Sequence, residues 1–282
     1  MDISVILMLI LAGVAGGFIA GLLGIGGGPI YVLIYYKSLV YYYPELADDN
    51  MIIQIVIANS IFSAFFAGFS ASVKQYQANN FFGQMVLYIC LPAIVTAILV
   101  TYAISFVIDY SSQQFTILFS IFLIPLVIKT LFTRELGSNM KNESSLTPPR
   151  DVNKWYLIGI GLISGVVTSL SGLGGGFVII PLLNGVLRYP IKRTLSISLG
   201  VIALVALILS AFNLFIETQG LADVPYAHGT LVLSFVLPVI IGVIFAAPFG
   251  VQLSHKLSPK VLKILFTIFA VLVVANLIFD LI

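Results

Sequence analysis

Long runs of apolar residues, separated by short polar stretches, recur along the whole chain. The longer runs hold about 20 residues, which is the length that a helix needs to cross a hydrocarbon core of about 30 Å. The pattern therefore predicts an all-α polytopic membrane protein. The expected segments span 3–23, 29–43, 51–73, 84–108 and 113–133, and then 156–171, 177–187, 194–216, 230–253 and 260–281.

Two of the apolar stretches carry three consecutive glycines. They read GLLGIGGGPIYV at 21–32 and SLSGLGGGFVII at 169–180, and the four glycines of GIGGG match those of GLGGG at a constant offset of 148 residues. Farther along, LPAIVTAI from Leu91 matches LPVIIGVI from Leu237. The sequence therefore predicts an internal duplication, a feature that is common among secondary transporters.

One long polar stretch, RELGSNMKNESSLTPPRDVNK, divides the chain near its middle. We expect it to be a linker at 134–154, between a first transmembrane repeat at 1–133 and a second at 155–282. Each repeat has about five segments, which is an odd number. The second repeat is therefore expected to enter the membrane inverted relative to the first.

The charges of the loops indicate an orientation, because Lys and Arg concentrate in cytoplasmic loops. A cytoplasmic linker and both termini outside place almost every charge on its expected side, with Lys37 as the exception. The alternative has four spans per half, the two halves in parallel orientation, and each glycine segment as a single interrupted helix. It puts Arg188, Lys192 and Arg193 opposite the linker and against this bias. The cytoplasmic set is Lys74, Arg134, Lys141, Arg150, Lys154, Arg188, Lys192, Arg193, Lys256, Lys260 and Lys263, and the outer set is Glu45, Asp48, Asp49, Asp109, Glu217, Asp223 and Asp280.

Composition supports the membrane assignment. Hydrophobic residues make up 60% of the chain and charged residues 9%, whereas soluble domains contain about 25% charged residues. The single cysteine, Cys90, excludes an internal disulfide or a cysteine-based metal site. We expect the lipid bilayer and a small anion as partners, with no cofactor, metal or nucleic acid.

The glycine runs predict a break in a helix. Glycine costs about 1 kcal/mol relative to alanine inside a helix, and a broken helix in lipid is tolerated only where its peptide groups face protein or a wet cavity. A new helix that begins after each run points its N–H groups, at the positive end of the dipole, toward an anion. We expect two such hairpins to meet near the midplane and to bind substrate through Gly24, Gly26, Gly27, Gly28, Gly172, Gly174, Gly175 and Gly176.

Polar side chains on neighbouring segments are candidates to complete this site. They are Asn59, Ser60, Ser63, Ser196 and Ser198, and the alternative for each is an interhelical hydrogen bond. Other glycines at four-residue spacing predict close helix packing instead: Gly13, Gly17, Gly21, Gly161 and Gly165. No predicted span carries a central nucleophile and base, so an intramembrane enzyme is not expected.

The two glycine motifs, with a polar linker between the halves, resemble the TauE/SafE sulfite exporter family. The resemblance covers nearly the whole chain and implies transport of sulfite, sulfoacetate or a related sulfonate across a prokaryotic cell membrane. One departure is that Phe177 stands where Pro29 follows the first glycine run, so the second hairpin is expected to differ in shape. We expect alternating access, with proton coupling as one option, and the alternative function is a passive anion channel.

Overall fold

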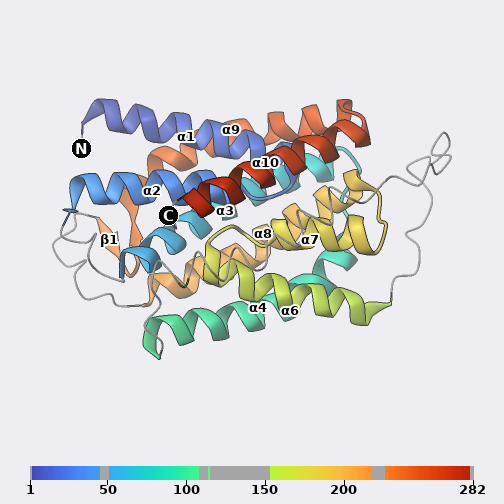
Figure 1. Cartoon of the computed structure of the whole chain (residues 1–282), viewed down its shortest axis with the longest axis horizontal. Coiled ribbons are helices and arrows are strands. Elements are labelled where there is room, and N and C mark those ends of the chain that lie inside the picture. Colours follow the sequence, from blue (N-terminus) through green and yellow to red (C-terminus); the bar gives the residue numbers. More distant parts are fainter. Residues whose placement is uncertain (1, 45–50, 108–113, 115–152, 217–225, 280–282) are drawn as a thin grey trace.

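The computed structural model describes residues 2–44, 51–107, 114, 153–216 and 226–279, and these residues are mostly helical (Figure 1). The first half contains α1 (Ile3–Leu23), α2 (Gly28–Tyr42), α3 (Met51–Gln77) and α4 (Gly83–Phe106). The second half contains α6 (Lys154–Ser171), α7 (Gly176–Ile180), the π-helix η2 (Pro181–Val186), α8 (Ile191–Leu214), α9 (Leu233–Lys256) and α10 (Pro259–Phe279).

Six described helices are long and apolar enough to cross a membrane, namely α1, α3, α4, α6, α8 and α9. The predicted all-α polytopic membrane protein is therefore confirmed. The segment predicted at 113–133 lies outside the described residues except for Gln114. Among the six, α3 and α8 are the most deeply buried and form the centre of the bundle.

The segment predicted at 230–253 differs at its start. A two-stranded antiparallel hairpin, β1 (Ala227–His228) and β2 (Leu231–Val232), precedes α9. The N–H of Val232 donates to Asn59 Oδ1 at 2.9 Å, and the N–H of Thr230 donates to Asn213 O at 3.1 Å. These partners on α3 and α8 accept hydrogen bonds from backbone N–H groups that would otherwise need a helix. For this reason α9 starts later than the hydrophobic pattern indicates.

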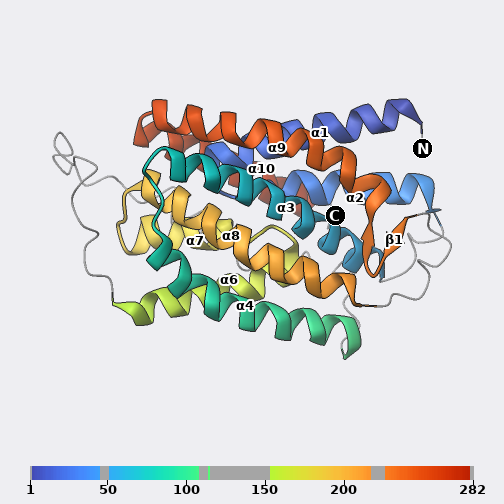
Figure 2. The same cartoon turned by 180° about the vertical axis from the view of Figure 1, so that it is seen from behind.

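Helices from the two halves pair closely. Figures 1 and 2 show α1 beside α9 and α4 beside α6, and α3 packs on α8 in the centre. A Cβ added to Gly13 would lie 2.1 Å from Val239 O, and one added to Gly161 would lie 2.3 Å from Ile89 O. The predicted role of these spaced glycines in helix packing is confirmed, because only a residue without a side chain permits such close backbones.

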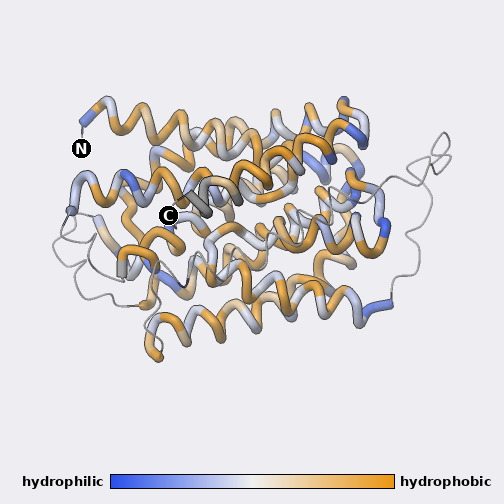
Figure 3. Tube along the Cα trace, viewed as in Figure 1, coloured by the Kyte–Doolittle hydropathy of each residue, from blue (hydrophilic) through white to orange (hydrophobic). Residues whose placement is uncertain are grey.

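The α1 and α6 helices, which begin the two halves, run in opposite directions (Figure 1). In each half the first helix packs against the third membrane-length helix of the other half, since α1 contacts α9 and α6 contacts α4. The apolar middle of the bundle is flanked by hydrophilic segments at its ends, as Figure 3 shows. This arrangement leaves the two glycine motifs in the interior, between the central helices.

Basic segments predicted to share one side of the membrane do contact one another. Lys192 Nζ donates to His255 O at 2.8 Å, and His255 Nε2 lies 2.9 Å from Gln75 Oε1, next to Lys74. These contacts join the end of α3, the start of α8 and the end of α9. The acidic loops of the opposite side fall outside the described residues, so the predicted orientation stays a prediction.

Candidate substrate site

The predicted helix break occurs in the first glycine motif. The α1 helix ends at Leu23, and the N–H of Gly24 donates to Ala20 O at 2.8 Å. Gly24, Gly26 and Gly27 have φ angles of 69°, 81° and 75° before α2 begins at Gly28. The left-handed conformation costs other residues about 1–2 kcal/mol, which explains why this turn consists of glycine.

The second motif repeats this turn. Gly172, Gly174 and Gly175 have φ angles of 68°, 79° and 72°, and the N–H of Gly172 donates to Thr168 O at 2.9 Å. The helices that follow differ, as the departure from the first motif predicts. Whereas α2 is one helix of 15 residues, α7 has 5 residues and continues as the π-helix η2 from Pro181.

The two turns, which we call the first glycine loop (Gly24–Gly27) and the second glycine loop (Gly172–Gly175), meet in the interior of the bundle. A Cβ added to Gly28 would lie 2.4 Å from Leu173 Cα, and one added to Gly176 would lie 2.7 Å from Gly24 O. Residues of both loops are buried. Glycine is therefore needed at these positions for close approach as well as for backbone conformation.

Most backbone N–H groups at the end of each loop and at the start of the next helix lack hydrogen-bond partners in the described part of the chain. Within the part of the chain that the structure describes, the N–H groups of residues 25–28 and 174–177 donate to no acceptor. Buried unpaired N–H groups are rare because each costs about as much as a lost hydrogen bond. Two sets of such donors, each at the start of a helix, form an arrangement that is suited to an anionic ligand.

Serine hydroxyls hold the carbonyl groups of the loops. Ser60 Oγ on α3 donates to Gly172 O at 2.8 Å and lies 3.3 Å from Gly28 O. Ser198 Oγ on α8 donates to Gly24 O at 2.7 Å. Each serine thus binds the glycine loop of the other half. These two predicted site residues contact the loops on their carbonyl side.

A model of the family described as Sulfite exporter TauE/SafE matches residues 7–277. The chain belongs to this family. A probable membrane transporter protein of Methanocaldococcus jannaschii is 28% identical over 258 residues, which cover 92% of this chain and 90% of that protein. A probable membrane transporter protein of Haemophilus influenzae is 25% identical over 274 residues, which cover 96% of this chain and 97% of that protein. Another, of Bacillus subtilis, is 20% identical over 293 residues, which cover 97% of each protein.

The resemblance inferred from the two glycine motifs is therefore confirmed, and this TauE/SafE protein is a membrane transporter of that type. No solved structure matches the chain significantly. The match extends across both halves, so it covers both glycine loops and the helices that surround them.

The other predicted side chains of this TauE/SafE protein bind partners apart from the loops. Ser63 Oγ lies 2.5 Å from Tyr35 Oη on α2. Asn59 Nδ2 donates to Ile55 O at 2.6 Å and to Thr230 O at 3.2 Å. Ser196, the remaining predicted residue, also binds a partner apart from the loops, because its Oγ donates to Asn80 O. These three side chains thus form interhelical or helix-to-loop hydrogen bonds.

Sequence reasoning missed two side chains that lie against the glycine loops. A Cβ added to Gly27 would lie 2.6 Å from Tyr31 Oη, and one added to Gly175 would lie 2.7 Å from Thr168 Oγ1. Both Tyr31 and Thr168 are buried. The only sequence signal was that each lies one or two helical turns from a glycine of its motif. That spacing does not distinguish them from other helical residues.

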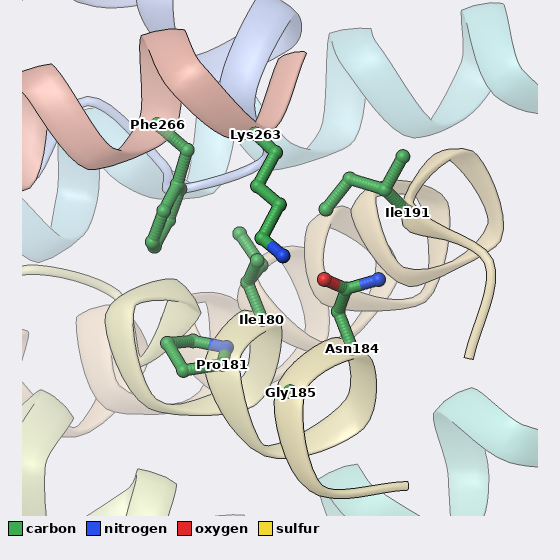
Figure 4. A pocket seen from close by; sticks show the side chains of 7 residues that line it. All are labelled: Ile180, Pro181, Asn184, Gly185, Ile191, Lys263 and Phe266. Carbon is green, nitrogen blue, oxygen red and sulfur yellow. The ribbon is translucent and has the colours of Figure 1, made fainter. Parts of the chain in front are cut away.

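A small recess lies beside η2, between the start of α8 and α10. Its lining is mostly apolar, with Ile180, Pro181, Gly185, Ile191 and Phe266 in its walls. Figure 4 shows the ammonium group of Lys263 and the side-chain amide of Asn184 directed toward each other across it. Asn184 Nδ2 also donates to Tyr189 O at 2.7 Å, which ties the π-helix to the loop before α8.

Residues that bind metals or react as nucleophiles do not cluster in the described part of the chain. No three His, Cys, Asp or Glu side chains there lie close enough to hold a metal ion. Cys90 is buried in α4, and its Sγ lies 3.7 Å from Leu87 O one turn earlier. This contact is typical of a cysteine that packs within a helix bundle.

Proposed function

We propose that this protein is a secondary transporter that moves a small sulfur-containing anion, such as sulfite, sulfoacetate or a related sulfonate, across the cell membrane. The observation that carries the proposal is the pair of buried glycine loops, with unpartnered N–H groups at 25–28 and 174–177. Peptide N–H groups at the start of a helix attract anions by hydrogen bonding and by the helix dipole. Membership of a transporter family supports the class of function.

The substrate is bound mainly by the backbone in this proposal. The donors come from Gly26, Gly27 and Gly28 in the first half and from Gly174, Gly175 and Gly176 in the second, while Gly24 and Gly172 end the preceding helices. Ser60 and Ser198 position the loops, because their hydroxyls donate to loop carbonyls. Neutral donors bind an anion less tightly than a buried arginine does, and a transporter must also release its substrate.

Access alternates between the two sides of the membrane through a relative movement of the halves. The loops touch in this structure, since a Cβ on Gly28 or Gly176 would overlap the opposite backbone. A substrate therefore reaches the N–H groups only when the loops separate. The opposite directions of α1 and α6 support a pair of inverted repeats, which suits such a movement. We propose the linker end as cytoplasmic and both termini as outside.

The test is uptake of radiolabelled sulfite into liposomes that contain the purified protein, with and without a pH gradient. Competitors are sulfoacetate, taurine, sulfate and chloride. Saturable uptake that is inhibited by a sulfonate and accelerated by the proton gradient supports a coupled transporter. Flux that never saturates and follows only the gradient of the anion indicates the passive anion channel. Absence of any sulfite flux contradicts the proposed substrate class.

Glycine variants test the location of the site. Gly27→Leu would drive a side chain against Gly16 O and the Tyr31 ring, and Gly175→Leu would drive one against Thr168 and Ser164. Both variants displace the loop that carries the donors and are expected to abolish transport. Gly159→Leu is the matched control, because a Cβ at Gly159 meets nothing within 4 Å. Transport is normalised to protein that elutes as a single folded species. Uptake close to wild type in both loop variants would refute a site built from these amides.

A further inference from the structure

Tyr31 carries a hydroxyl that the fold leaves without a partner. The side chain has 0% of its surface exposed, and no described group forms a hydrogen bond with its Oη. A buried hydroxyl without a partner destabilises the folded state, and such a group in a native protein calls for an explanation. One turn later on the same helix, Tyr35 Oη pairs with Ser63 Oγ at 2.5 Å, so burial alone does not explain the difference.

Six other buried hydroxyls in the described part of the chain lack partners, and five of them belong to serine or threonine. Serine and threonine in a helix can satisfy themselves by turning toward the carbonyl four residues earlier. A tyrosine hydroxyl stands at the end of a rigid ring and cannot reach its own helix backbone. Apart from Tyr31, the only tyrosine in this set is Tyr189, which lies in the loop before α8; the others are Ser38, Ser72, Thr101, Thr194 and Ser210.

The ring of Tyr31 is fixed against the first glycine loop. A Cβ on Gly16 of α1 would lie 2.2 Å from Tyr31 Cε1, and a Cβ on Gly27 would lie 2.6 Å from Tyr31 Oη. The ring therefore fits between two positions that only glycine can occupy. Its hydroxyl lies directly beside the residue that precedes α2, where the N–H groups of residues 25–28 are also unpartnered. Side-chain and backbone donors thus occur together.

The second half has no equivalent of this hydroxyl. At the offset of the glycine motifs, the counterpart of Tyr31 is Ile179, which is fully buried. The side chain that lies against Gly175 is Thr168, and its hydroxyl already donates to Ser164 O at 2.7 Å. The two glycine loops therefore differ, and only the first one offers a free side-chain donor next to its free amides.

We infer that the Tyr31 hydroxyl is a substrate-binding donor, which hydrogen bonds to an oxygen of the transported oxyanion together with the amides of the first glycine loop. The inference rests on the proposed function and adds two features to it. One is a side chain that determines the affinity for the substrate, and the other is a difference between the two halves. The first loop holds the oxyanion through side chain and backbone, and the second loop through backbone alone. The ring is already fixed by Gly16 and Gly27, so binding orders no flexible side chain.

Tyr31→Phe tests this inference because it removes only the hydroxyl and keeps the ring between the two glycines. Tyr189→Phe is the matched control, since it also removes a buried, unpartnered tyrosine hydroxyl but lies outside both loops. Two quantities are measured for each variant and for wild type. They are the sulfite concentration that gives half-maximal uptake into liposomes, and the midpoint of thermal unfolding in detergent with and without sulfite.

The expected result has two parts. Tyr31→Phe raises the half-maximal sulfite concentration about tenfold or more, because a hydrogen bond to a charged acceptor is lost, and it reduces the stabilisation by sulfite. Without sulfite its unfolding midpoint equals or exceeds that of wild type, because an unpaired buried hydroxyl has gone. Tyr189→Phe leaves the half-maximal concentration within twofold of wild type.

Two outcomes would overturn the inference while the proposed function stands. The first is saturable wild-type uptake with the same half-maximal concentration in Tyr31→Phe as in Tyr189→Phe. The second is a lower unfolding midpoint for sulfite-free Tyr31→Phe, which would mean that the hydroxyl is bonded within the fold. If wild type itself shows neither saturable sulfite uptake nor stabilisation by sulfite, the proposed function fails instead.

Discussion

Replacing Gly28 with alanine is the most direct test of the contact between the glycine loops. The added Cβ would lie 2.4 Å from Leu173 Cα, 2.9 Å from Leu173 C and 3.0 Å from Gly172 O. Ordinary contact begins at 3.4 Å, so the loops would have to separate by about 1 Å. All three atoms belong to the backbone, and no rotamer change can relieve the overlap.

The cost follows from this geometry. Overpacking in a close-packed interior costs about 1–3 kcal/mol, and separation of the loops also lengthens the 2.8 Å hydrogen bond from Ser60 Oγ to Gly172 O, worth about 1 kcal/mol. Alanine recovers up to about 1 kcal/mol of helix propensity. We therefore expect a net loss of about 1–3 kcal/mol, or an unfolding midpoint lower by about 5 °C.

The assay is thermal unfolding in detergent. The measured quantity is the fraction of protein that still elutes as a monodisperse species after heating. Gly159→Ala is the control, because it gains the same helix propensity and its Cβ meets nothing within 4 Å. Its midpoint should equal or slightly exceed that of wild type. If Gly28→Ala and Gly159→Ala unfold at the same temperature, the two loops do not touch as described, and the reasoning is wrong.

Four further substitutions probe the contacts of the loops, the hairpin and the helices. Ser60→Ala and Ser198→Ala should each lower the free energy of unfolding by about 1–3 kcal/mol because a buried loop carbonyl loses its donor; equal stability to wild type in thermal unfolding would contradict this. Asn59→Ala should raise hydrogen exchange at the β1–β2 hairpin, measured by mass spectrometry, since the N–H of Val232 loses its acceptor. Gly21→Ala should destabilise the contact of α1 with α9 by about 1–3 kcal/mol, because its Cβ would lie 2.0 Å from a backbone oxygen; a midpoint unchanged in the same unfolding assay would count against that packing.

The helices and their breaks were predictable because their causes are local. Apolar runs of membrane-spanning length specify helices whatever surrounds them, and α1, α4 and α8 begin and end within a few residues of the predicted bounds. The glycine runs predicted turns for the same reason, since positive φ angles at Gly24 and Gly172 depend on the absence of a Cβ. The TauE/SafE family was also recognisable from these motifs.

The surroundings of the candidate site depended on tertiary structure. Ser60, Ser63 and Ser198 look alike in the sequence, but the bundle directs two of them to loop carbonyls and the third to Tyr35. Tyr31 carried no signal that distinguishes it from other helical residues, because its position between Gly16 and Gly27 arises only from packing. Hydrophobicity and backbone conformation are properties of short segments, and a single sequence expresses them directly. Which hydroxyl finds a partner is decided by atoms brought together from distant parts of the chain, and only the packed structure determines it.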